Sequence, residues 1–195
     1  MKVVIGLGNP GRRYVETRHN LGFKAVEEFC RRERLAWSAE ECHSRIARGS
    51  LAGEDVVVAE PQTFMNRSGE AVECLLRAGG AEPSDLLVVC DDAAIDLGAL
   101  RVRAAGSAGG HRGLESIIRA LGTEDFPRLR IGIRTAPVLR GDLAERVLAP
   151  FSREEGEEAG RQAARAADCI RVVLELGVSA AMNRFNRRQP NEPSA

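Results

Sequence analysis

Two histidines in this sequence stand where a general base would be placed. His19 precedes an apolar, helix-like segment, and His111 follows Gly109-Gly110 at the start of another. The N-terminal end of a helix disfavours the imidazolium form, so a histidine there keeps a neutral ring that can accept a proton. Each histidine could instead only cap or pack its helix. The third, His43, stands where a strand begins, without an evident partner, and we interpret it as a surface residue.

A carboxylate that could pair with such a base follows a short apolar run. Asp91 comes after five apolar residues, 86–90, and a charge at the mouth of a buried strand usually needs a partner. The alternative is a turn-capping role, for which Asp92 would be equivalent. The sequence holds neither a Gly-x-Ser-x-Gly elbow nor a cysteine nucleophile motif. A hydrolase built from these residues would therefore use a water molecule activated by a His–Asp pair.

Amide and aromatic side chains occupy the neighbouring loops. Asn9 follows the first apolar run, and Asn66 opens a helix, where an amide can cap the helix or donate to a developing oxyanion. Tyr14 and Phe64 lie in or near loops and could stack on a base, although core packing is the default for Phe64. The Gly6-Leu7-Gly8 segment lacks the third glycine of a dinucleotide-binding loop, so we reject that interpretation.

Composition and charge narrow the class of protein. The 195 residues are 44% hydrophobic and 29% charged, which excludes disorder, collagen and a disulfide miniprotein. The formal net charge is zero, yet only Lys2 and Lys24 are lysines among 28 basic residues. Eight arginines against three acidic residues give segment 97–140 a charge of +5, which could meet phosphates.

The five cysteines are scattered along the chain, and none forms a Cys-x-x-Cys motif. They therefore suggest neither a disulfide framework nor a zinc site, and the Cys42-His43 pair alone is weak evidence for a metal. The sequence shows no apolar run long enough for a membrane span and no signal peptide, so we expect a cytoplasmic protein.

The hydrophobic pattern predicts the elements that must position these residues. We expect strands over 3–7, 44–51, 55–59, 86–90, 100–103 and 129–133, and helices over 20–34, 66–77, 112–121, 153–177 and 179–187. This alternation predicts one α/β domain over residues 1–188, with a mixed, twisted β-sheet flanked by helices on both faces, and a loose tail over 189–195. Ligand sites in such sheets gather where strands end, which is where Asn9 and Asp91 are expected.

Taken together, several of these segments resemble the bacterial peptidyl-tRNA hydrolases. Their order and spacing agree from Met1 to Phe151, whereas the C-terminal helices fit in type only. The matching segments are residues 4–11, Tyr14 with 17–23, residues 61–69, Asp91, residues 109–111 with 113–114, and residues 128–133. Several motifs in one order are far more specific than any single motif.

The resemblance implies a reaction and two catalytic residues. The family cleaves the ester that joins a nascent peptide to the 3′-terminal ribose of tRNA, and so recycles tRNA from abandoned translation. By resemblance His19 is the general base that activates water, and Asp91 orients its ring and stabilises its protonated form. The family acts as a soluble monomer, so the resemblance implies a monomer without metal or other cofactor and with peptidyl-tRNA as its partner.

The resemblance also implies how the substrate is bound. Asn9 would sense that the amino group is acylated, and Asn66 would bind substrate and polarise the carbonyl or hold the water. Tyr14 and Phe64 correspond to residues that line the site of the tRNA 3′ end. Three arginines fall where the family places basic residues toward the tRNA body: Arg101, Arg103 and Arg130.

The chain departs from the family pattern at two places. Arg112 replaces the asparagine that usually follows His111; it keeps hydrogen-bond donors and adds a permanent charge, so we expect it to bind substrate. The second departure follows the strand, where the family often has His-Asp-Glu-Leu-Asp and this chain has Cys90-Asp91-Asp92-Ala93-Ala94. Asp91 itself is present, so the core chemistry should be retained.

Two other functions compete with a peptidyl-tRNA esterase. A catalytically idle RNA-binding homologue, similar to the organellar splicing factors related to this family, could keep most of the motifs. The intact His19, Asp91, Asn9 and Asn66 argue against it, whereas Arg112 argues slightly for it. An acyl or peptide hydrolase unrelated to RNA is disfavoured by the arginine-rich segment.

Overall fold

A seven-stranded mixed sheet forms the centre of the computed structural model, which describes residues 1–135 and 147–186. Its strand order is β2-β3-β4-β1-β5-β7-β6. The strands are β1 (Lys2–Gly6), β2 (Trp37–Glu41), β3 (Ser44–Leu51), β4 (Glu54–Pro61), β5 (Leu86–Asp96), β6 (Leu100–Arg103) and β7 (Arg128–Arg134). The central β4, β1, β5 and β7 run parallel, and β2, β3 and β6 pair antiparallel with their neighbours.

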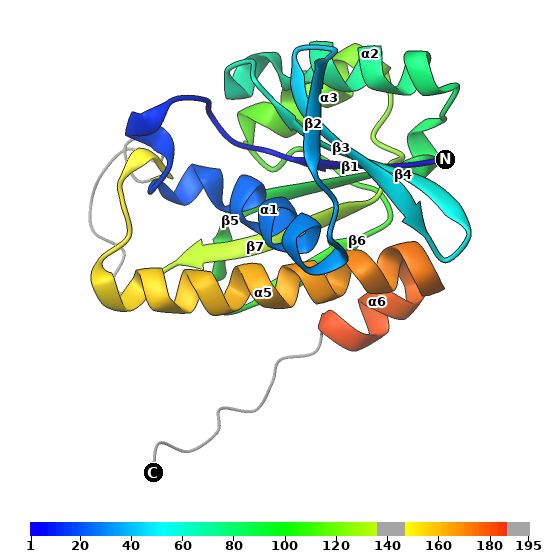
Figure 1. The fold of residues 1–195 in the computed structure, drawn as a ribbon. Coiled ribbons are helices and arrows are strands. Elements are labelled where there is room, and N and C mark those ends of the chain that lie inside the picture. The colour runs from blue at the N-terminus through cyan, green and yellow to red at the C-terminus, as the bar shows by residue number, and fades with distance from the viewer. Residues whose placement is uncertain (136–146, 187–195) are drawn as a thin grey trace.

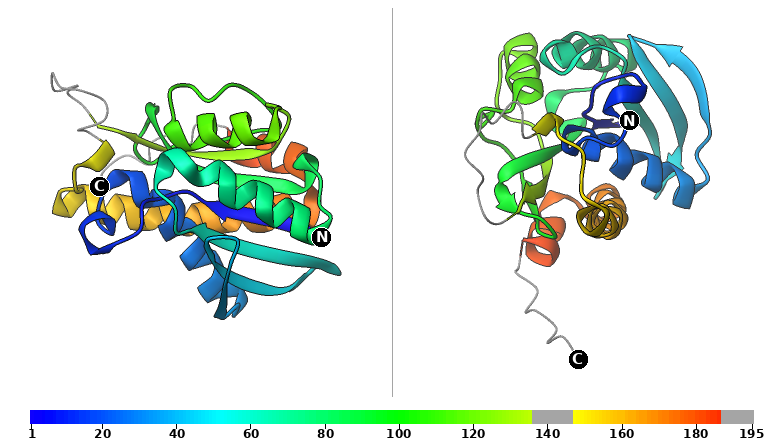
Figure 2. Two further views of the ribbon diagram at one scale, coloured as in Figure 1. Left: turned by 90° about the horizontal axis from the view of Figure 1, so that it is seen from above. Right: turned by 90° about the vertical axis from the view of Figure 1, so that its left-hand side faces the viewer.

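Helices cover both faces of this sheet (Figure 1 and Figure 2). The helices are α1 (Leu21–Glu33), α2 (Ser68–Gly79), α3 (Arg112–Leu121), α5 (Arg153–Leu176) and α6 (Val178–Phe185), with short 3₁₀ turns η1 (Arg12–Tyr14), η2 (Arg18–Asn20), η3 (Met65–Arg67) and η4 (Pro83–Asp85). Helices α1, α5 and α6 pack on one face and α2 and α3 on the other. The predicted α/β class with a mixed sheet and helices on both faces is confirmed.

The sequence of the central strands explains why both faces are covered. Successive side chains of a strand point to opposite faces, and the central strands are apolar on both. In β1, Val4 contributes to the core under α1 and α5, whereas Val3 and Ile5 contribute to the core under α2 and α3. All three side chains are fully buried, so neither face can be left to solvent.

The strand that carries Asp91 is longer than the sequence predicts. We expected it to end at Cys90, but β5 continues to Asp96 because β7 pairs with its second half, Asp91 opposite Ile131. The neighbour on the other side, β1, ends at Gly6 opposite Val89. Asp91 therefore lies inside β5 but beyond the end of β1, which leaves it at the open carboxyl edge of the sheet.

One strand and one covalent link were not predicted. The edge strand β2 is short and mostly exposed, and only Trp37 and Ala39 in it are apolar. A disulfide joins Cys42, in the β2–β3 turn, to Cys74 in α2, with 5.5 Å between the Cα atoms. This corrects the expectation that the cysteines form no disulfide, because the fold brings together two residues 32 positions apart. It also makes Cys42 unavailable for the metal pair considered with His43.

Two features of the sequence fall on residues that the structure does not describe. The tail predicted over 189–195 lies outside the described residues, as does Arg140 of the arginine-rich segment. Among the helices of the described part, none is long and apolar enough to cross a membrane.

Candidate active site

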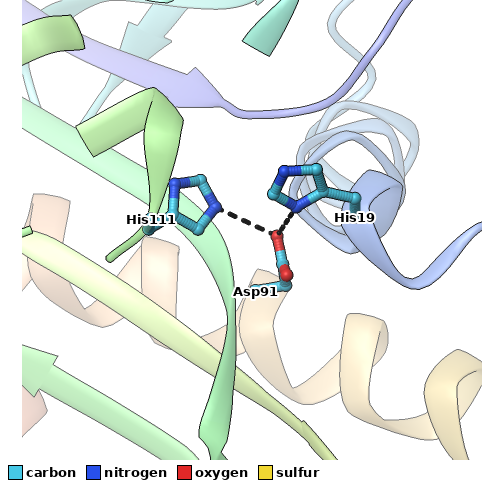
Figure 3. Close-up of side chains that lie close together, drawn as sticks. All are labelled: His19, Asp91 and His111. Atoms are coloured by element: carbon cyan, nitrogen blue, oxygen red, sulfur yellow. Dashed lines mark hydrogen bonds and ion pairs between the residues drawn. The ribbon is translucent and has the colours of Figure 1, made fainter. Parts of the chain in front are cut away.

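Three buried polar side chains meet at the carboxyl edge of the sheet (Figure 3). His19 Nδ1 lies 2.7 Å from Asp91 Oδ1, and His111 Nε2 lies 3.1 Å from the same oxygen. The three residues come from η2, β5 and the N-cap position of α3, and each is at most 9% exposed. The predicted proximity of His19 and Asp91 is therefore present, and His111 joins them.

The hydrogen bonds assign a tautomer to His111. Its Nδ1 accepts hydrogen bonds from the backbone amides of Gly113 and Leu114, so this nitrogen carries no proton. The ring proton is therefore on Nε2, which donates to Asp91. His111 thus caps α3, as the capping alternative predicted, and donates to the Asp91 carboxylate at the same time.

The same logic assigns the proton of His19. Asp91 Oδ1 is an ionised acceptor, so His19 donates from Nδ1 and its Nε2 is left with a free lone pair. Burial would raise the pKa of Asp91, but His19 and His111, by charge and by hydrogen bonds, hold that pKa well below its usual range. Nε2 of His19, with its free lone pair, is therefore the atom that could accept a proton from a water molecule.

A glycine allows the His19 segment to reach the sheet. Gly22 is the second residue of α1. A Cβ built there would lie 2.4 Å from the carbonyl oxygen of Leu7 and 2.5 Å from that of Val89. Only glycine permits this approach, which brings η2 and its His19 down against the ends of β1 and β5. The conformation of His19 is thus set by close packing of the backbone.

Two glycines turn the chain so that His111 faces Asp91. Gly109 and Gly110 have φ angles of +60° and +78°, in the left-handed region that favours glycine. The turn is closed by the His111 amide, which donates to the carbonyl of Ala108 at 3.2 Å. The glycine-rich segment before α3 therefore positions a histidine.

Hydrogen bonds through two asparagine side chains connect the loops around His19 and Asp91. The side chain of Asn20, next to His19, accepts from the backbone N–H of Asn9 at 2.8 Å and donates to the backbone carbonyl of Asn9 at 3.0 Å. Asn9 Oδ1 in turn accepts from the Met65 amide at 2.9 Å. Among the described residues, Asn9 Nδ2 has no partner, so it is the part of this amide available to a ligand. Sequence reasoning missed Asn20, although its amide directly follows the candidate base.

A cavity of about 640 Å³ opens above the three residues and is lined by the predicted substrate-binding residues. Its wall includes Asn9, Tyr14, Phe64, Asn66 and Arg112. The Phe64 side chain is 52% exposed, so it is not the core residue that was the default expectation.

The three arginines predicted to face the tRNA body fall into two settings. Arg101 and Arg103 are exposed on edge strand β6. Arg130, on β7, is only 13% exposed in its side chain, lines the cavity and bonds to Asp92 at 3.0 Å. The strand register places Arg101 beside the cavity-lining Arg130, and Arg103 beside Arg128.

The same three residues have the types and spacing of metal ligands, because His19, Asp91 and His111 each offer one ligand atom within 4.8 Å of the others. The two hydrogen bonds described above already satisfy these atoms. A thiol nucleophile is not available beside them, since burial raises the pKa of Cys90 and keeps it protonated.

Comparisons with known proteins show the family of this chain. The family model described as Peptidyl-tRNA hydrolase matches residues 3–193. The peptidyl-tRNA hydrolase of Roseiflexus sp. is 46% identical over 97% of this chain and 88% of its own length, and that of Aquifex aeolicus is 42% identical over 96% and 97%. The crystal structure of peptidyl-tRNA hydrolase from Acinetobacter baumannii superposes with a TM-score of 0.89 at 31% identity, covering 97% of this chain and 96% of that chain. The chain belongs to the peptidyl-tRNA hydrolase family.

Proposed function

We propose that this protein hydrolyses the ester between a nascent peptide, or another N-blocked aminoacyl group, and the 3′-terminal ribose of tRNA. The observation that carries the proposal is the buried His19–Asp91 pair, 2.7 Å apart, at the floor of an open cavity in a chain of this family. The comparisons give no support to an idle RNA-binding homologue.

In the proposed reaction, His19 Nε2 takes a proton from water as the water oxygen attacks the ester carbonyl carbon. The tetrahedral intermediate collapses, the bond between carbonyl carbon and ribose oxygen breaks, and the protonated His19 returns a proton to the ribose oxygen. Asp91 stabilises the imidazolium between these steps. Asn66, exposed at the cavity wall, is placed to donate to the developing oxyanion, and the free Nδ2 of Asn9 to contact the acylated amino group.

The cavity rim supplies groups for the end of the tRNA. Tyr14 and Phe64 present rings on which the terminal base can stack. Arg112 lies on the same wall and has no ion-pair partner among the described residues, so its guanidinium can hold a phosphate near the 3′ end. Arg101 and Arg103 extend this positive surface toward the tRNA body. We assign the enzyme to the cytoplasm as a metal-independent monomer that acts in ribosome rescue.

The test uses purified protein and two substrates, N-acetyl-aminoacyl-tRNA and the free aminoacyl-tRNA. We expect release of the N-acetyl-amino acid, little attack on the free form, no change with EDTA, and weaker tRNA binding as salt rises. Activity that is lost in EDTA and restored by zinc would contradict the metal-free mechanism. Binding of tRNA without hydrolysis of either substrate would contradict the proposed function itself.

A further inference from the structure

The guanidinium of Arg130 is already committed to protein groups on two sides. Its Nη1 donates to Asp92 Oδ2 at 3.0 Å, and its Nη2 donates to the carbonyl oxygen of Ser107 at 2.6 Å. Nη2 also lies 3.5 Å from the Ala108 carbonyl, and a Cβ built on Gly109 would lie 3.2 Å from Nη1. Only 13% of the side chain is exposed.

These partners are the neighbours of two of the three site residues. Asp92 directly follows Asp91 in β5. The carbonyl of Ala108 accepts the hydrogen bond from the backbone N–H of His111 that closes the turn before α3. Arg130 therefore ties the strand that holds Asp91 to the loop that delivers His111. Both connections are made with charge-assisted or short hydrogen bonds at a largely buried position, where such bonds are strong.

A second arginine of β7 anchors the base of the same loop. Arg128 is fully buried and donates to the carbonyls of Gly106, Glu124 and Phe126. Its Nη1 also lies 3.5 Å from the carbonyl oxygen of Ser107, which Arg130 contacts as well. The loop between β6 and α3 is thus held at its base by Arg128 and at its catalytic end by Arg130.

Arg101 and Arg103 differ from these two arginines although they lie beside them in the sheet. They pair across the strands with Arg130 and Arg128 respectively, but they are exposed and have no hydrogen-bond or ion-pair partner among the described residues. Free, exposed guanidinium groups suit phosphate contacts. The arginine-rich segment therefore contains two kinds of arginine with different surroundings.

We propose that Arg130, through its ion pair with Asp92, is a positioning residue that holds His111 against Asp91 for the hydrolytic reaction. This inference rests on the proposed function. If the loop loses Arg130, the Nε2 donor of His111 withdraws, and Asp91 loses one of its two hydrogen bonds. The reaction should then slow on any substrate, including one that lacks the tRNA body.

The experiment measures kcat and KM for Arg130→Met on N-acetyl-aminoacyl-tRNA and on a short 3′-terminal oligonucleotide carrying the same ester. We expect kcat to fall about tenfold on both substrates, with KM changing less. The matched control is Arg134→Met, which removes the exposed ion pair to Asp96 formed by the same two strands. That variant should keep the kcat of the wild type.

A double-mutant cycle shows whether Arg130 acts through His111. His111→Asn removes the donor to Asp91 but keeps a residue that can cap α3. In that background Arg130→Met should cause little further loss of kcat. Multiplied losses in the double variant, or a change confined to KM for full-length tRNA with a weaker salt dependence, would overturn the proposal and make Arg130 a phosphate contact.

Two further arms keep the result decisive. Asp92→Asn breaks the same ion pair from the other strand and should reproduce the loss of kcat, so it replaces Arg130→Met if that variant does not fold. Normal kcat in a folded Asp92→Asn variant also overturns the proposal. Failure of the proposed function has a different signature, since the wild type would then hydrolyse neither substrate.

Discussion

Two carboxylates of this protein are equally buried but have opposite acid–base behaviour. Asp91 in β5 and Glu60 in β4 are each 1% exposed, on strands that flank β1. His19 and His111 hold the pKa of Asp91 well below its usual range, although burial opposes them. Burial raises the pKa of Glu60 to about 8; nearby Glu27 adds to the rise, and Arg45 only partly offsets it.

The difference lies in the partners and not in the depth of burial. Both donors of Asp91 are themselves buried and aimed at one oxygen. Glu60 has a single partner, Arg45 at 2.9 Å, whose side chain is 41% exposed, and its Oε1 has no hydrogen bond among the described residues. The fold therefore keeps Asp91 charged at neutral pH, where the proposed chemistry uses it, and favours the protonated form of Glu60.

The largest expected effect is on the catalytic side of this comparison. His19→Ala removes the group that accepts the proton of water, and general-base catalysis contributes about 10²- to 10⁴-fold. We expect kcat for N-acetyl-aminoacyl-tRNA to fall by that factor in single-turnover assays, while tRNA binding measured by filter retention is unchanged. His43→Ala, at an exposed histidine, is the matched control and should keep full activity. More than a tenth of the activity remaining in His19→Ala would refute the assignment.

A smaller loss of activity is expected from Asp91→Asn. Asparagine retains an oxygen that can accept from His19 but cannot stabilise the imidazolium by charge, so kcat should fall on the order of 10- to 100-fold. Folding lowers the pKa of Asp91, so its charge stabilises the fold at neutral pH and this contribution disappears as the pH falls into the acid range. The free energy of unfolding of Asp91→Asn should therefore decline less than that of the wild type on acidification. Equal acid sensitivity would show that the histidines do not favour the charged form.

The proposed catalytic pair could be predicted from the sequence because local signals marked both members. His19 precedes a clear apolar helix and Asp91 follows a clear apolar run, and the family resemblance then joined residues 72 positions apart. The bounds predicted for α3, 112–121, agree with the structure because His111 caps its start and Gly122 ends it in the left-handed conformation. Strong local signals at both ends thus gave a reliable element.

The sequence predicted that His111 could cap α3, but not that its ring would contact Asp91, since the glycines before it indicate a turn but not its direction. The burial of Glu60 could not be predicted either, because an acidic residue at a strand is normally expected to face solvent. The Cys42–Cys74 disulfide and the long β5 depend on contacts between elements distant in sequence. What the sequence left open is what tertiary packing alone determines.

The Glu60 side of the comparison predicts an effect on stability. Because folding raises the pKa of Glu60 from 4.5 to about 8, the free energy of unfolding should fall as the pH rises through this interval. Each unit of pKa difference corresponds to about 1.4 kcal/mol, so the loss can reach a few kcal/mol. Glu60→Gln should remove most of this pH dependence when urea unfolding is compared at about pH 5 and about pH 8.5, near the two ends of the interval.

A matched control for this stability measurement is Glu41→Gln. Glu41 is an exposed strand residue, and its hydrogen bonds to Arg48 lower its pKa. Between about pH 5 and 8.5, Glu41 is largely ionised in both the folded and the unfolded chain. The free energy of unfolding of this variant should therefore change with pH as it does in the wild type. A slope that stays unchanged in Glu60→Gln would mean that the buried carboxylate is not the group responsible.

The smallest effect is expected from Arg45→Met, which removes the one cation bonded to Glu60 among the described residues and keeps an apolar stem. Since 41% of the Arg45 side chain is exposed, solvent screening limits the loss to about 1 kcal/mol at pH 9, where Glu60 is ionised. At pH 5.5 Glu60 is protonated in the fold, and the loss should nearly vanish. In the Glu60→Gln background it should vanish at both pH values. An equal loss at both, in either background, would show that Arg45 stabilises the fold by packing on Trp37, whose ring centroid lies 4.8 Å from its guanidinium carbon, and not by its charge.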